Sequence, residues 1–297
     1  MGIGKEQIRT IVGDIRDLPT IPSVGTRIIE LASDPDVSID ELSEALHQDP
    51  SLAARVLKIA NSPFYGTARH VDTLQLAVVI LGLNEIRNIA LGVTFFNSMK
   101  NLNPNLSLFR ETFWHHSAAC GVVARILGRK LEVRCEGTDF IAGLLHDMGK
   151  IVIDTCFDGK FVEIFNKTYK HKPAMLEAEE EILGDTHEEF GSWLAEKWHL
   201  PQIICDAISY HHKFPSVASL DIFKNPKVVS IAYISEAFCE HYEIGWDGDF
   251  GNSNMRNERA WDVLLSGQKT YTMNDVDTII TETMQVFNEA QNYLLWE

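Results

Sequence analysis

Helical patterning extends over almost the whole 297-residue chain and restricts the folds that it can adopt. Apolar residues recur every three or four positions, and no segment shows the apolar/polar alternation of a half-buried strand. Capping signals mark several helix starts, among them the capping box from Ser38 to Glu41 and the pair Asp49–Pro50. No internal repeat at a fixed period is found. The sequence therefore predicts an all-α fold.

The pattern also sets the expected order of helices. Thr73 and Asn84 are expected to cap two successive helices, and Thr138 is expected to cap the helix that carries His146 and Asp147. Gly149 is placed to end that helix. The main expected helices are residues 5–17, 24–32, 108–127, 159–169, 173–182, 187–198, 201–210, 226–242, 258–265 and 273–295.

Two polar stretches suggest how the chain is divided. Residues 100–107 contain a proline and three asparagines, which is typical of a linker or boundary, and residues 243–257 are rich in Gly, Asn and Asp, which is typical of a loop. We expect an N-terminal helical part over 1–105 and a second helical part over 106–245. A loop and closing helices follow over 246–297.

Charge and cysteine usage exclude several classes of protein. The chain has 42 acidic and 26 basic side chains, a formal net charge of −16, which disfavours general nucleic-acid binding. Its five cysteines form no Cys-x-x-Cys pair, as expected of reduced thiols in the cytoplasm. The first residues are too polar for a signal peptide, and no apolar run reaches the ~18–20 residues of a membrane span. The expected location is cytoplasmic, without a membrane partner.

His146 and Asp147 follow an apolar run, where burial is costly for polar groups. Each buried polar group costs roughly 1–3 kcal/mol unless it is paired. A metal ion would satisfy both side chains, because imidazole nitrogen and carboxylate oxygen are common ligands of Zn, Mn, Fe and Ni. The pair is therefore the first candidate for a metal site.

Further histidines lie on or at the ends of expected helices. A single histidine at a helix end is more often a cap or a surface residue that the helix dipole favours, so the order alone does not show that these residues converge. Either residue of the first doublet is a possible ligand, and a glutamate four positions before one of them could lie beside it. These candidates are Glu111, His115, His116, His187, His211 and His212.

Several longer motifs resemble the HDOD family, the HD-related output domain within the superfamily of HD metal-dependent phosphohydrolases. They are Leu18-Pro19-x-x-Pro22, residues 48–66 (QDPSLAARVLKIANSPFYG), residues 75–83 (QLAVVILGL), residues 113–117 (FWHHS) and residues 143–149 (GLLHDMG). The resemblance implies an N-terminal helical subdomain packed on an HD-like helical bundle. We expect the aromatic residues near Asn61–Gly66 to pack between these two parts.

Similarity to the HD-GYP phosphodiesterases within that superfamily implies a set of site residues. It implies one or two divalent transition-metal ions (Fe, Mn, Ni or Zn), with Asp147 bridging them, and it makes Asp147 and Lys150 the candidate catalytic residues. Lys150 would neutralise a phosphate oxygen, or simply be a lysine that the helix dipole favours. The implied ligands are His116, with His115 as the alternative, His146, Asp147, His187, His211 and His212, and Glu111 lies where a carboxylate sometimes precedes the first histidine.

Two departures from the HD pattern bear on the function. Tyr233 occupies the position of the terminal aspartate, with Glu236 three residues further on, so we expect the last ligand to be lost or replaced. Lys213-Phe214-Pro215 follows His212 where the phosphodiesterases have their Gly-Tyr-Pro signature. The predicted function is a bacterial signal-transduction module that contacts a separate signalling protein and retains a metal site. The alternative is an active phosphohydrolase that acts on a nucleotide or cyclic dinucleotide.

Overall fold

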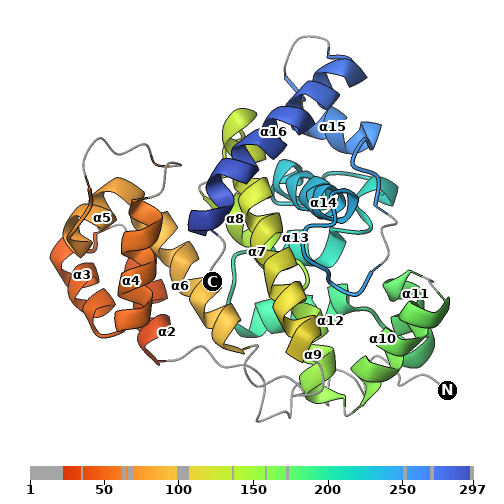
Figure 1. The fold of residues 1–297 in the computed structure, drawn as a ribbon, viewed down its shortest axis with the longest axis horizontal. Helices are drawn as coiled ribbons and strands as arrows, with labels where there is room; N and C mark the ends of the chain where they lie inside the picture. Colours follow the sequence, from red (N-terminus) through yellow and green to blue (C-terminus); the bar gives the residue numbers. More distant parts are fainter. Residues whose placement is uncertain are drawn as a thin grey trace.

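The computed structural model confirms the all-α class, since its described residues contain no strand (Figure 1). The expected helix over 5–17 and the polar boundary near 100–107 lie largely outside these residues. The structure describes residues 23–34, 36–61, 65, 70–98, 107–135, 137–157, 159–171, 174–249, 253–267 and 271–294.

The N-terminal helices form a lobe at one end of the molecule (Figure 1). The predicted caps are confirmed: the Ser38 hydroxyl accepts a hydrogen bond from the Glu41 N–H, and Asp49 and Thr73 cap the two following helices. Local sequence therefore determines where these helices begin. They are α2 (Ser23–Ser33), α3 (Ile39–His47), α4 (Pro50–Ala60), α5 (Leu74–Leu81) and α6 (Leu83–Ser98).

The prediction that Asn84 caps a helix is wrong. Helix α6 begins at Leu83, directly after Gly82, and Asn84 lies inside its first turn. Gly82 has a φ of 79°, a left-handed conformation that glycine adopts without strain, and it makes the bend between α5 and α6 possible. None of the described helices alone has the length and hydropathy to cross a membrane. Only α5 and α6 taken together reach that composition, and they meet at a bend of 108°.

The long helix α7 (Ser107–Lys130) is the centre of the second part. Its apolar side chains from Ala118 to Leu127 are almost fully buried, and α8, α14 and α16 pack against it. The central helices are α8 (Thr138–Leu145), α9 (Met148–Cys156), α12 (His187–Lys197), α13 (Gln202–Tyr210) and α14 (Pro226–His241).

Shorter elements cover this centre at its edges (Figure 1). Helices α10 (Lys160–His171) and α11 (Met175–Ile182) pack together beside α9. On another side, α15 (Glu258–Leu264) packs on α14, and α16 (Met273–Leu294) packs on α7. A 3₁₀ turn (Phe214–Ser216) follows the His211–His212 pair. Together, these elements cover the middle of α7, α8 and α14, which is buried.

The His146–Asp147 pair lies in a turn between two helices, which corrects two predictions. Thr138 is the first residue of α8, after Gly137 as its cap, and α8 ends at Leu145. Gly149 does not end a helix, since α9 begins at Met148. A Cβ on Gly149 would lie 1.8 Å from the His187 carbonyl oxygen, so glycine is needed here for the close approach of α9 to α12.

Buried charges join the N-terminal lobe to the second part. The Arg125 guanidinium on α7 donates hydrogen bonds to Glu85 on α6 (2.5 Å), to Asp139 on α8 (3.1 Å) and to the hydroxyl of Tyr65 (3.2 Å). Tyr65 packs against the hydrophobic core, as expected for an aromatic residue between the two parts. Removing one partner of such a buried network costs about 3–5 kcal/mol, so the contact should hold the lobe firmly in place.

Candidate metal centre

Three helices bring one group of possible metal ligands together. His116 and Cys120 lie one turn apart on α7, His146 follows α8, and Glu236 lies in the middle of α14. Glu236 Oε2 is 2.9 Å from His116 Nε2 and 2.6 Å from His146 Nε2. One ligand atom from each of the four residues lies within 4.8 Å of the others, and all four side chains are buried. We call this set the His116 group.

A second group lies directly beside the first. It consists of Asp147, His187 at the start of α12, and His211 and His212 at the end of α13. The Nε2 atoms of His187 and His211 are 3.2 Å apart, and Asp147 Oδ1 lies 3.2 and 3.5 Å from them, respectively. We call this set the Asp147 group. The two groups are adjacent because His146 and Asp147 are consecutive residues.

The hydrogen bonds of the histidines leave Nε2 available to a cation. His146 Nδ1 is 2.7 Å from the Gly143 carbonyl oxygen, and His211 Nδ1 is 2.8 Å from the Ile208 carbonyl oxygen. A carbonyl oxygen only accepts, so both Nδ1 atoms carry a proton, and Nε2 is the ring atom through which each imidazole would bind a cation, in its neutral form. His187 Nδ1 faces the Glu179 carboxylate at 2.8 Å in the same way. Metal-binding histidines are held by such bonds.

Several buried polar atoms at the centre have no hydrogen bond. They include Asp147 Oδ1, Glu236 Oε1, His212 Nε2 and His146 Nε2. His146 Nε2 lies close to Glu236 Oε2, but without the geometry of a hydrogen bond. Unpaired buried polar atoms are rare because each one is costly. A transition-metal ion would satisfy them, and the nitrogen, carboxylate and thiol donors fit such an ion.

The pKa values of the buried histidines are shifted in different directions by their surroundings. Burial would lower the pKa of His116, but the Glu236 and Asp247 carboxylates outweigh it and raise this pKa to about 10. Burial would also lower the pKa of His187, but the Glu179 carboxylate raises it to about 10. Burial lowers the pKa of His211, and that of His212 further still, so these two imidazoles stay neutral, the form that binds metals.

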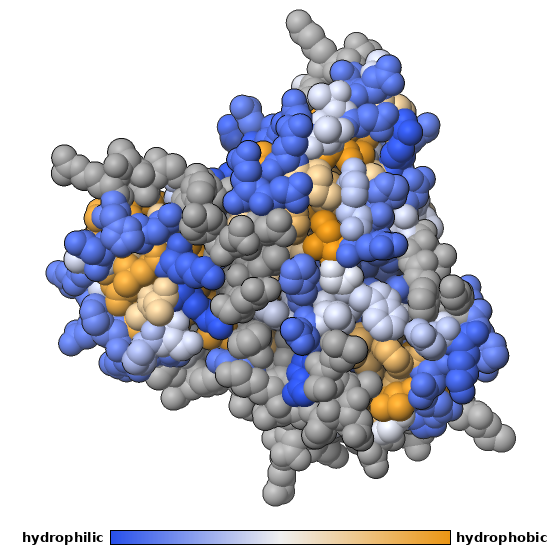
Figure 2. Space-filling view, in the orientation of Figure 1, coloured by the Kyte–Doolittle hydropathy of each residue, from blue (hydrophilic) through white to orange (hydrophobic). Residues whose placement is uncertain are grey.

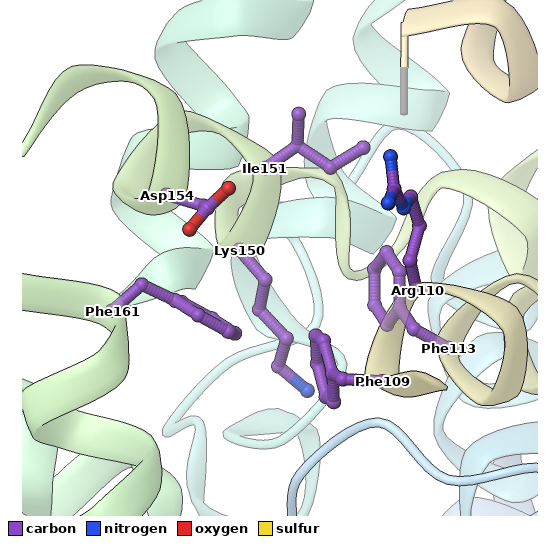
Figure 3. A pocket seen from close by; sticks show the side chains of 7 residues that line it. All are labelled: Phe109, Arg110, Phe113, Lys150, Ile151, Asp154 and Phe161. Carbon is purple, nitrogen blue, oxygen red and sulfur yellow. The ribbon is translucent and has the colours of Figure 1, made fainter. Parts of the chain in front are cut away.

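Lys150 lies beside the cluster but is already paired. Its ammonium donates hydrogen bonds to Asp147 Oδ2 at 2.7 Å and to Asp247 Oδ2 at 2.5 Å. The side chain is 1% exposed, and Phe109, Phe113 and Phe161 surround it (Figure 3). The hollow between them has a volume of about 10 Å³, room for a single water molecule. The positive charge of Lys150 is therefore balanced by the Asp147 and Asp247 carboxylates of the protein itself.

Two of the predicted ligands do not reach the cluster. His115 is half-buried and Glu111 is exposed, and neither belongs to the groups formed by the described residues. Adjacent residues on a helix point about 100° apart, so when His116 faces the core, His115 does not. Glu111 lies five positions before His116 and therefore on another face of α7. The structure brings together His116, His146, Asp147, His187, His211 and His212.

Three residues of the centre were not among the predicted ligands, although Glu236 was noted beside the expected position of the last one. Glu236 supplies the carboxylate that was expected to be lost or replaced, whereas the Tyr233 hydroxyl bonds to the backbone of Asn254. Asp247 comes within 4.8 Å of His116, Asp147 and Glu236 from the loop after α14. Cys120 is the third. Cys120 lies four residues after His116, and Glu236 lies three residues after Tyr233. Both spacings were usable signals, whereas nothing in the loop marks Asp247.

An acidic cleft of about 360 Å³ opens beside the cluster. At its wall, a Cβ on Gly245 would lie 2.3 Å from the backbone nitrogen of His116, so this loop passes directly over α7. The backbone N–H of Trp246 holds the loop there by donating a hydrogen bond to the Thr112 carbonyl oxygen at 3.1 Å. The cleft is lined by His116, Glu240, Glu243, Gly245, Trp246, Asp247 and Asp249.

These features define an all-helical protein with a buried cluster of histidine and carboxylate side chains. The sequence model of the HDOD domain matches residues 18–214. The chain therefore belongs to the HDOD domain family, as its motifs predicted.

Solved structures show the same fold. An HDOD domain protein of unknown function from Geobacter sulfurreducens is 28% identical, with 99% of both chains covered and a TM-score of 0.79. A proposed phosphohydrolase from Shewanella amazonensis is 18% identical, with 96% of this chain and 97% of that chain covered and a TM-score of 0.70. A proposed signal transduction protein from Marinobacter aquaeolei is 21% identical, with 97% and 64% covered and a TM-score of 0.68.

Two curated proteins are also similar in sequence. An uncharacterised protein of Treponema pallidum is 25% identical over 210 residues, which are 69% of this chain and 40% of that protein. The deoxynucleoside triphosphate triphosphohydrolase SAMHD1 of Gallus gallus is 28% identical over 145 residues, which are 44% of this chain and 22% of that protein. The similarity thus spans less than half the length of either relative.

Proposed function

We propose that this chain is a bacterial regulatory module that holds a transition-metal ion and acts by contact with a signalling protein. The acidic cleft carries this proposal. Its lining includes Glu240, Glu243, Asp247 and Asp249 but no lysine or arginine. A phosphate group that approached the cluster through this cleft would pass Glu243, Asp247 and Asp249, with His116 as the one basic side chain in the lining. Like charges repel one another most strongly where water is scarce.

The position of Lys150 supports the same view. A lysine that is to bind a phosphate oxygen must offer unpaired N–H groups. The Lys150 ammonium instead bonds to Asp147 and Asp247, and these two carboxylates raise its pKa well above the usual value although burial opposes them. Freeing this ammonium for a substrate would leave both buried carboxylates without their partner, which is costly.

The metal itself is supported by the donor set. The His116 group and the Asp147 group each present four possible ligand atoms that lie within 4.8 Å of one another, and Asp147 directly follows His146 of the first group. One or two ions of Zn, Fe, Mn or Ni suit nitrogen-rich ligation with carboxylates. When bound, such an ion helps to stabilise the fold, because its ligands are distant in sequence.

Exposed apolar side chains support contact with a partner protein. On α3 and α5, which pack together, Ile39 is 42% exposed, Leu76 is 40% exposed and Val79 is 61% exposed. Figure 2 shows hydrophobic residues gathered on this lobe, over α3 and α4. We place the contact with a signalling partner on this lobe. The five free cysteines support a location in the reducing cytoplasm.

An active metal-dependent phosphohydrolase is the second candidate. It is supported by the adjacency of the two ligand groups, since two nearby ions that share a carboxylate can activate a water molecule for attack on phosphorus. Similar structures with phosphohydrolase names agree with it. In this case Asp147 would hold both ions, and a nucleotide or cyclic dinucleotide would be the substrate.

A hydrolysis screen separates the two candidates. Metal-loaded wild-type protein and Asp147→Ala are incubated with nucleoside triphosphates and cyclic dinucleotides, in the presence of Zn²⁺, Mn²⁺ or Fe²⁺, and the products are quantified. We expect equal, background-level turnover, because the cleft repels phosphate. Turnover by the wild type that Asp147→Ala abolishes would establish the phosphohydrolase instead.

A further inference from the structure

Cys120 has surroundings that are unusual for a buried cysteine. Buried cysteines generally pack as small apolar groups. The Cys120 thiol instead lies 3.4 Å from His116 Nε2 and 3.7 Å from Glu236 Oε2, with the Ser235 carbonyl oxygen also at 3.7 Å. The side chain is 0% exposed. A thiol that faces an imidazole nitrogen and a carboxylate is placed as a ligand would be.

The two distances from the Cys120 sulfur within the His116 group are close to those of tetrahedral coordination. Metal bonds of about 2.0–2.1 Å to nitrogen and oxygen and about 2.3 Å to sulfur place two ligand atoms about 3.3–3.6 Å apart at the tetrahedral angle. The two distances from Cys120 Sγ fall at 3.4 and 3.7 Å. The distances from Glu236 Oε2 to the two histidines are shorter, 2.9 and 2.6 Å, and a bound ion would lengthen them.

We propose that Cys120 is a metal ligand, and that His116, Cys120, His146 and Glu236 form a four-coordinate site for a thiophilic ion such as Zn²⁺. This inference rests on the proposed metal-bearing function and makes it more specific. The thiol proton is released to solvent as the thiolate binds the ion, with no change in oxidation state.

A fourth protein ligand changes what the site can do. Catalytic zinc sites keep one position open for water or substrate, whereas structural sites are closed by four protein ligands. With Cys120 in place, the His116 group is closed, and Asp147 remains available to the neighbouring histidines. The soft sulfur ligand also favours Zn²⁺ over Mn²⁺ at this group. Both consequences agree with a regulatory module whose metal stabilises its core.

X-ray absorption of the zinc-loaded protein tests the assignment. We expect a sulfur scatterer at about 2.3 Å from zinc in the wild type. Cys120→Ser should lose this scatterer. Cys239→Ser should retain it, and it is the matched control because Cys239 is also 0% exposed and its thiol lies next to that of Cys120. A cobalt titration of the wild type provides a second readout that needs no variant, since a thiolate ligand gives an ultraviolet charge-transfer band.

The possible outcomes separate this inference from the function on which it rests. Zinc with nitrogen and oxygen scatterers only, together with no charge-transfer band, would overturn the role of Cys120 and leave the metal centre intact. A sulfur scatterer that persists in Cys120→Ser would also overturn it. A wild-type protein that binds neither zinc nor cobalt would overturn both the inference and the proposed metal function.

Discussion

Glu240 lies one turn after Glu236 on α14 and lines the acidic cleft, whose charges affect its pKa. Its Oε1 atom is buried without a hydrogen bond, while its Oε2 atom accepts one from the Ser253 N–H at 3.2 Å. Burial, together with the charges of Glu236, Asp247 and Asp249, raises the pKa of Glu240 to about 9. The folded protein therefore holds the proton on this side chain more tightly than the unfolded chain does.

The substitution Glu240→Gln should stabilise the protein at alkaline pH. Because the folded pKa is raised from 4.5 to about 9, the wild type loses stability as pH rises through this window. A neutral glutamine removes this loss and retains an acceptor for Ser253. We expect a gain in the free energy of unfolding of at least ~1 kcal/mol at pH 8, since one pKa unit corresponds to about 1.4 kcal/mol.

Chemical denaturation at pH 5 and pH 8 measures this effect. The matched control is Glu243→Gln, which removes an exposed carboxylate from the same cleft and should change stability little at either pH. Equal gains for the two variants at pH 8 would show that burial of Glu240 is not the cause.

At the scale of single residues, the motifs and the order of the histidines predicted which histidines come together. They did not predict the other side chains that lie beside them. His146 and Asp147 stand out because polar residues rarely follow a buried apolar run, and the structure places six of the proposed ligands together. That they bind a metal stays a prediction. Asp247 could not be found in this way, because a loop has no periodicity that reveals where its side chains point.

At the scale of the elements, local signals predicted helix starts well. Ser38, Asp49 and Thr73 cap their helices because capping involves only a residue and its next few neighbours. The prediction that Gly149 ends a helix was wrong for a different reason, as was the prediction that Asn84 caps one. Gly149 is a glycine because α12 approaches α9 closely, and contacts between helices are not visible in a local window.

Helix α5 should be part of the contact with a signalling partner. A photoreactive amino acid in place of Val79 should form a specific adduct with one protein in the native cell, because this position is 61% exposed on an apolar helix. The matched control is the same amino acid in place of Tyr169 on α10, which is 62% exposed at the other end of the molecule. The same adducts at both positions, or none at position 79, would contradict this placement.

In the whole molecule, the N-terminal lobe bonds to α8, the helix that precedes His146 and Asp147 of the candidate metal centre. The Asn88 side chain on α6 donates to the Gly137 carbonyl oxygen at 2.5 Å, and Arg125 links Glu85 to Asp139 in the first turn of α8. His146 and Asp147 follow the other end of the same short helix. Helix α8 therefore connects the N-terminal lobe, at its first turn, with the buried cluster, at its other end.

The metal content of the purified protein decides whether the buried cluster holds an ion. Wild-type chain prepared without chelator is analysed for transition metals, beside His116→Ala and His115→Ala, which replace adjacent histidines of which only the first faces the cluster. We predict at least one ion per chain in the wild type and in His115→Ala, and a clear loss in His116→Ala. A wild-type chain without metal, or equal metal in the two variants, would contradict the account.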